Sequence, residues 1–212
     1  MRISMLSPAL GALVEDIDLA ESPTSSQAEA LRAALVKYHL LHVHAPHLSD
    51  ADQVRFSQIF GPVHDERGDG LRTQYVSNIR EDGIIREGAL LFHSDLAFTP
   101  EPVPGLSLYA MEIPRGGSPT RFANAERAWR LLDPDLRGRL REMHARHAFD
   151  LITQRGDERY RYVDLPDDQP QAEHPVAFVN PRTREPVLYV NEMQTLRILE
   201  CDLAGSDALL GE

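Results

Sequence analysis

The chain has 212 residues, of which 42% are hydrophobic and 26% charged, so it is long enough to bury the core of one globular domain spanning residues 1–212. Acidic residues outnumber basic ones by 33 to 22, and the resulting formal charge of −11 disfavours nucleic acid and anionic membranes as partners and favours a small molecule. The single cysteine, Cys201, excludes an internal disulfide, and no apolar run is long enough to span a bilayer, so we expect a cytoplasmic protein.

The first half of the sequence predicts alternating strands and helices. Residues 1–20 read as two short strands around Gly11, and the Ser and Thr residues of SPTSSQ can cap a helix over 27–39. A strand is expected at 40–45, and Ser49 is a plausible N-cap for a helix over 51–61. A further strand, RTQYVSNI at 72–79, lies between two glycine-containing turns.

The second half predicts strands, two helices and a hairpin. The apolar run LSLYAMEI at 106–113 reads as a strand, and residues 125–149 have a helical period that is broken at Asp133 and Pro134, which indicates two helices. Residues 150–175 are charged and are expected to form an exposed excursion. PVAFVN and PVLYVN, joined by PRTRE, predict a hairpin, and a short helix is expected to start at Ser206.

The stretch ALLFHSDLAFTP, residues 89–100, places His93 and Asp95 two positions apart in an apolar run that reads as a buried strand. Residues at i and i+2 of a strand share one face, so the two side chains are expected to project together. A buried carboxylate needs a compensating cation or several donors, and an imidazole beside a carboxylate supplies two of the three ligands of a 2-His-1-carboxylate iron site. The spacing alone also fits an aspartate that only orients His93 or caps a turn.

A longer piece, LFHSDLAFTPEPVPGLSLYAMEIPRGGSPTRFAN, resembles the taurine dioxygenase (TauD/TfdA) family of Fe(II)- and 2-oxoglutarate-dependent oxygenases. The family pattern has an aromatic-H-x-D motif, a proline-rich turn, an apolar strand and then E-x-P, a pair of glycines and a threonine. The matching residues are Phe92, His93, Asp95, Glu112, Pro114, Gly116, Gly117 and Thr120. Ser118 and Pro119 place Thr120 one residue later than in the commonest form. Segments before and after this piece also resemble the family, so the resemblance extends over most of the chain.

The resemblance implies a fold, a reaction and a set of site residues. The fold is mainly β with flanking helices, a double-stranded β-helix of the jelly-roll, cupin-like kind, with the metal in the mouth of the barrel. His93 and Asp95 would be the catalytic metal ligands, Thr120 would hydrogen-bond the distal carboxylate of 2-oxoglutarate, and His64 and Asn78 would fall near the substrate. The implied reaction uses dioxygen and 2-oxoglutarate to hydroxylate a small organic acid or related metabolite.

The resemblance breaks near the end of the chain. In the family, a second histidine ligand and the arginine that binds 2-oxoglutarate lie in the closing strands, and here no histidine followed by an arginine at a suitable separation occurs after Asn191. We therefore expect only two protein ligands for the metal. We also expect a barrel that lacks its last strands, whose unpaired edges favour association with other chains, as in a homo-oligomer. This leaves open a catalytically inactive dioxygenase remnant or a small-molecule-binding scaffold. A hydrolase that uses another metal with His93, Asp95 and a further histidine is a third reading. His42 with His44, and His144 with His147 at the end of a charged helix, read as ordinary surface residues.

Overall fold

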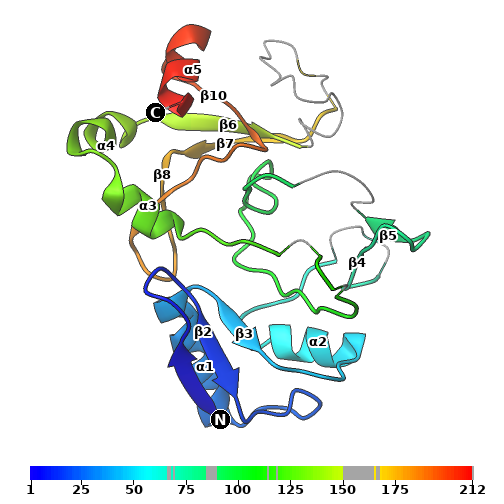
Figure 1. The fold of residues 1–212 in the computed structure, drawn as a ribbon. Helices are drawn as coiled ribbons and strands as arrows, with labels where there is room; N and C mark the ends of the chain where they lie inside the picture. The colour runs from blue at the N-terminus through cyan, green and yellow to red at the C-terminus, as the bar shows by residue number, and fades with distance from the viewer. Residues whose placement is uncertain are drawn as a thin grey trace. The chain divides into compact units, whose positions relative to one another are not determined.

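The computed structural model describes residues 1–65, 68, 70–84, 90–113, 115–117, 119–149, 165 and 168–211. These fall into two compact units, one within residues 1–87 and 105–121 and the other within residues 88–104 and 122–212 (Figure 1). Short strands with a few helices make up both units, which confirms the expected mainly β class. The expectation of a single domain stays a prediction. No helix in the described part of the chain is both long enough and apolar enough to cross a membrane.

The first unit is organised around a three-stranded sheet in the order β1-β2-β3, with β1 (Arg2–Met5), β2 (Ala12–Glu15) and β3 (Leu41–Val43). β1 pairs antiparallel with β2, and β2 pairs parallel with β3 through a crossover that contains α1 (Ser25–Tyr38) (Figure 1). Ala12, Val14 and Leu31 are buried at this sheet and helix. The predicted pair of strands and the predicted first helix are therefore confirmed.

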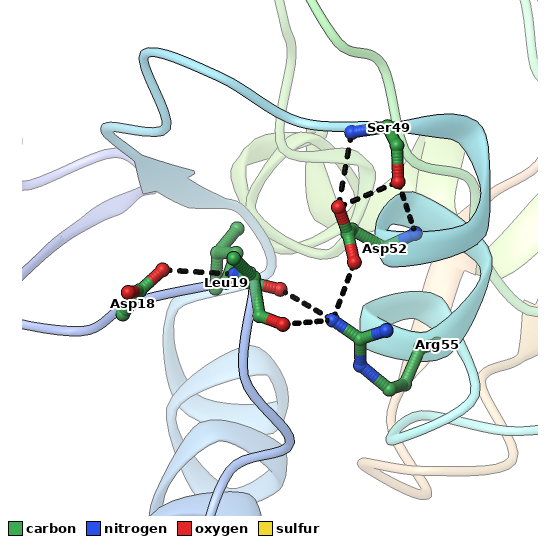
Figure 2. A network of polar contacts seen from close by, with 6 residues as sticks. Asp18, Leu19, Ser49, Asp52 and Arg55 are labelled. Carbon is green, nitrogen blue, oxygen red and sulfur yellow. Dashed lines mark hydrogen bonds and ion pairs between the residues drawn. The ribbon is translucent and has the colours of Figure 1, made fainter.

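Side-chain caps decide where the two helices of this unit begin. Thr24 and Gln27 form a capping box at the start of α1, and Ser49 and Asp52 form another at the start of α2 (Asp50–Ser57), so the predicted cap at Ser49 is confirmed. Arg55 extends the second network, because its guanidinium donates to the Leu19 carbonyl at 3.0 Å as well as to Asp52 at 2.6 Å (Figure 2). The first turn of α2 is thus tied to the loop that follows β2.

The remaining strands of the first unit are shorter than the sequence indicated. β4 (Tyr75–Val76) pairs parallel with β5 (Gly83–Ile84), so only the centre of the strand predicted over 72–79 forms. The strand predicted over 106–113 is wrong: the segment is irregular and pairs with no strand among the described residues. Its apolar side chains face solvent, which removes the burial that would favour a strand. They are Leu106, Leu108, Met111 and Ile113, all at least 58% exposed.

The second unit contains a three-stranded antiparallel sheet and a hairpin. The sheet runs β10-β6-β7, with β6 (His144–Ala148) between β7 (Gln171–Pro175) and β10 (Thr195–Ile198). The hairpin pairs β8 (Ala177–Val179) with β9 (Pro186–Leu188), which confirms the predicted hairpin. The described part of this unit also contains three helices: α3 (Ala125–Leu131), α4 (Pro134–Leu140) and α5 (Leu203–Gly211).

Helices α3, α4 and α5 pack with the sheet around one apolar core. The buried members of this core are Trp129, Leu140, Ala145, Val176, Ile198 and Leu209. A buried polar contact joins α5 to the sheet, because the hydroxyl of Ser206 accepts the backbone N–H of Ile198 at 2.8 Å. Trp129 is the largest side chain of this core and is 2% exposed.

The helices of the second unit match the sequence better than its strands do. Two helices separated at Asp133 are confirmed, and Asp133 caps α4 by accepting the backbone N–H of Asp135 at 2.9 Å. The helical reading of residues 144–149 is wrong, because 144–148 form β6. Most of the excursion predicted over 150–175 lies outside the described residues, but its end, 171–175, is β7. α5 begins at Leu203, three residues before the expected start at Ser206.

Candidate metal centre

The segment that carries His93 and Asp95 is a loop and a turn, so the predicted buried strand is wrong for the described residues 90–100. Leu90, Leu91 and Phe92 are 40–50% exposed, so the apolar run that indicated burial lies at the surface. After His93 the chain turns sharply, with the N–H of Ala97 donating to the Ser94 carbonyl at 3.2 Å. The shared strand face therefore does not explain how the two side chains meet.

His93 and Asp95 nevertheless lie side by side. Nε2 of His93 is 3.3 Å from Oδ1 of Asp95, and Nδ1 of His93 is 2.8 Å from the Leu91 carbonyl. Since a carbonyl only accepts, Nδ1 carries a proton and Nε2 is the atom that faces the carboxylate. The Asp95 side chain is 48% exposed and that of His93 24%, so the expectation of a buried carboxylate is wrong.

The pair needs a positive charge between its two facing atoms. With its proton on Nδ1, neutral His93 would point a lone pair of Nε2 at the carboxylate oxygen, and two electron-rich atoms at this distance repel. The hydrogen bond with Asp95 accordingly raises the pKa of His93, burial opposes the rise, and the bond to Leu91 adds to it. A proton or a metal cation can fill the same position.

The geometry of the pair fits adjacent positions on one metal ion. Two neighbouring ligands of an octahedral ion, each about 2.1 Å from it, lie about 3 Å apart. The separation of 3.3 Å between Nε2 and Oδ1 is close to this value. A histidine ligand that donates its other N–H to a backbone carbonyl, as His93 does to Leu91, is the usual outer arrangement of a metal site.

A second histidine-carboxylate pair in the same unit has a different geometry. Nδ1 of His144 is 2.9 Å from Oε1 of Glu200, and Oε2 of Glu200 accepts the backbone N–H of His144. Both oxygens of this carboxylate are therefore occupied by a single residue. In the described part of the chain, no group of three or more His, Cys, Asp or Glu side chains gathers in a way that could hold a metal ion.

Beside the candidate centre lies an aromatic cluster that the sequence did not predict, formed by His147, His174, Phe178 and Tyr189. Burial raises the pKa of Tyr189 to about 12, and the negative charge of Asp95 adds to this effect. Burial also lowers the pKa of His147 to about 4, with a smaller contribution from His174. His147 is fully buried, so its reading as a surface residue at a helix end is wrong.

The other residues predicted for the site belong to the first unit. Thr120, His64 and Asn78 are all exposed there, which leaves each accessible to a ligand. Gly116 of the glycine motif has a φ of 79°, a backbone conformation that favours glycine, while Pro114 and Ser118 lie outside the described residues. The roles expected for Thr120, His64 and Asn78 stay predictions.

Comparison with known proteins shows the family to which the chain is similar. A family model described as taurine catabolism dioxygenase TauD, TfdA family matches residues 2–212. The chain is 28% identical over 200 residues to an (S)-phenoxypropionate/alpha-ketoglutarate-dioxygenase of Sphingobium herbicidovorans, covering 85% of this chain and 67% of that protein. It is 30% identical over 232 residues to a pentalenolactone F synthase of Streptomyces avermitilis, covering 95% of this chain and 74% of that one.

Several solved structures have a fold similar to that of this chain. A taurine dioxygenase from Burkholderia xenovorans superimposes with a TM-score of 0.71 at 23% identity, covering 99% of this chain and 70% of that one. AAD-2 in complex with Mn(II) and N-oxalylglycine gives a TM-score of 0.70 at 18% identity, covering 99% of this chain and 76% of that one. The mainly β arrangement with flanking helices is therefore shared with solved dioxygenases.

Proposed function

Because the chain belongs to the TauD/TfdA family of taurine catabolism dioxygenases, we propose that it is an Fe(II)- and 2-oxoglutarate-dependent dioxygenase that hydroxylates a small organic acid or a related metabolite. The observation that carries the proposal is the pair formed by Nε2 of His93 and Oδ1 of Asp95, 3.3 Å apart. Relatives named as alpha-ketoglutarate dioxygenases support the co-substrate, and the Mn(II) in the AAD-2 complex supports a divalent metal.

In this proposal His93 and Asp95 would hold the metal through Nε2 and Oδ1, and the bond from Nδ1 to the Leu91 carbonyl fixes the tautomer in which the neutral imidazole presents the lone pair of Nε2 to a cation. Because Asp95 is half exposed, ligands from solution would have access to a metal held by this pair. When bound, Fe(II) with 2-oxoglutarate and dioxygen supplies the oxidising power for hydroxylation of a C–H bond. The protein contributes orientation and charge.

Three further assignments belong to the same proposal. Thr120 would donate its hydroxyl to the distal carboxylate of 2-oxoglutarate, which suits a short exposed hydroxyl near a bound anion. His64 and Asn78 would contact the substrate. The fold would be a double-stranded β-helix of the jelly-roll, cupin-like kind, in a cytoplasmic enzyme that acts on a small molecule.

Anaerobic titration with Fe(II) and 2-oxoglutarate tests the proposal, because their chelate on a protein gives a weak visible charge-transfer band. We expect the band in the wild-type chain and its loss in Asp95→Asn, which removes the ligand charge but keeps the side-chain size. Glu200→Gln is the matched control, since it removes the carboxylate of the His144 pair and should leave the band unchanged.

The same titration separates the proposal from its rivals. A wild-type chain that binds neither Fe(II) nor Mn(II) would contradict the dioxygenase and favour the inactive remnant or scaffold. If the band forms, succinate release in air, measured with a panel of aryloxyalkanoic acids and sulfonates, identifies the substrate class. Succinate release that continues unchanged in Asp95→Asn would refute the assigned role of the pair.

A further inference from the structure

One contact links the turn that carries Asp95 to a distant strand. His174, near the end of β7, places Nε2 2.9 Å from the backbone carbonyl of Thr99, 75 residues away in sequence. Since a carbonyl only accepts, Nε2 of His174 must carry the proton and donate it. His174 is 4% exposed, so water does not compete strongly for this donor.

Thr99 in turn closes the strained part of the turn. Its backbone N–H and its hydroxyl both reach the carbonyl of Leu96, at 2.9 Å and 2.8 Å. Leu96 has a φ of 54°, in the left-handed region that a leucine adopts only when its surroundings impose it. The two residues after Leu96 are packed inward, because Ala97 is fully buried and the centroids of the Phe98 and Phe149 rings are 4.9 Å apart.

Asp95 stands at the start of this arrangement. It lies directly before Leu96 in the turn, and among the described contacts its carboxylate meets only His93, through a pair that is partly open to solvent. A carboxylate on an exposed turn keeps a fixed position only if the backbone beneath it is fixed. The bond from His174 to Thr99 supplies that constraint from the buried side.

We propose that His174 is a positioning residue for the candidate metal centre: its Nε2–H holds the Thr99 carbonyl and so fixes the turn that presents Asp95 to His93. The metal part of this inference rests on the proposed function. The constraint on the turn is a property of the protein alone and can be measured without metal.

The surroundings of His174 allow the hydrogen bond to be separated from packing. The imidazole lies against Phe178 and Tyr189 with ring centroids 6.1 Å and 5.4 Å away. His174→Phe retains an aromatic ring in this cluster but removes the donor. His174→Gln places an amide N–H where Nε2 stood and restores a donor toward Thr99.

Affinity for Mn(II) alone, followed by electron paramagnetic resonance of the free ion, tests the effect on the centre. We expect His174→Phe to bind Mn(II) about tenfold more weakly than wild type, the lower end of the effect of losing an outer partner of a metal site. His174→Gln should recover most of the affinity. Equal affinity in wild type and His174→Phe would overturn the inference while leaving the proposed function intact.

Amide hydrogen exchange, measured by NMR without metal, provides the independent readout. In His174→Phe the amides of Ala97 and Thr99, which close the turn, should exchange faster, whereas the Val176 amide, bonded to the Met143 carbonyl, should keep its protection. His174→Gln should restore the protection of the turn. Loss of protection at Val176 as well would show a general structural role and overturn the inference.

The two readouts distinguish the possible failures. A wild-type chain that binds no Mn(II) refutes the proposed function, and the exchange experiment alone then decides whether His174 holds the turn. Unchanged exchange at Ala97 and Thr99 in His174→Phe overturns the positioning role, whatever the metal affinity.

Discussion

The buried imidazole of His147 should make the stability of the protein depend on pH in a defined window. The side chain is fully buried on β6, with Nδ1 3.2 Å from the Thr195 hydroxyl and no hydrogen-bond partner for Nε2 among the described residues. Burial lowers its pKa from 6.5 to about 4. At a pH between about 4 and 6.5, His147 is therefore protonated in the unfolded chain but neutral in the folded chain.

The size and sign of the effect follow from proton linkage. Because the unfolded state binds more protons, the free energy of unfolding falls as pH drops from about 6.5 to about 4. Below about pH 4, His147 is protonated in both states and causes no further change. A shift of about 2.5 pH units, at about 1.4 kcal/mol per unit, corresponds to a loss on the order of 3 kcal/mol. This is a large part of the stability of a typical domain.

Urea unfolding at a series of pH values between 7.5 and 4.5 measures this loss, with His147→Phe as the reference that has an aromatic ring but no titrating group. Subtracting the two profiles removes most of the contribution of the 33 acidic residues, which both proteins share. The wild type should lose about 3 kcal/mol more than the variant across the window. Parallel profiles would show that His147 titrates normally in the folded state and would refute the reasoning.

Three further outcomes are expected. Mn(II) affinity should fall as pH drops through the raised pKa of His93, because a proton then occupies Nε2 in place of the cation; a pH-independent affinity would contradict this. Ile198→Ala should lower the free energy of unfolding by about 3 kcal/mol, whereas Leu131→Ala, at an exposed position, should change it by less than about 0.5 kcal/mol. Ser49→Ala should lower it by about 1 kcal/mol, because the first-turn N–H of Asp52 loses its acceptor, and an unchanged urea midpoint would argue against the cap.

Local signals predicted the helices because their ends are determined by neighbouring residues. Ser49 and Asp133 were recognisable as caps since their side chains bond to N–H groups two or three positions later. The sequence did not predict β6, whose partners lie far along the chain, at 171–175 and 195–198. Its residues, HARHA, follow a helical segment and carry no strand pattern strong enough to outweigh that context.

The candidate site was predicted by chemical type and not by local structure. The H-x-D spacing and the family motif indicated that His93 and Asp95 would meet, and they do, but in a turn and not on a strand. A left-handed Leu96 has no sequence signal, because glycine or asparagine would be expected there. The contact of His174 with Thr99 was equally hidden, since nothing local to either residue indicates the other.

The long reach of that contact affects when the site can form during synthesis. A growing chain that has just exposed His93 and Asp95 lacks β7, and the Thr99 carbonyl has no donor until residue 174 has left the ribosome. Closing so long a loop is slow compared with forming a turn or a helix. If His93 and Asp95 hold metal as proposed, the metal should be acquired late, after the sheet around β6 has assembled.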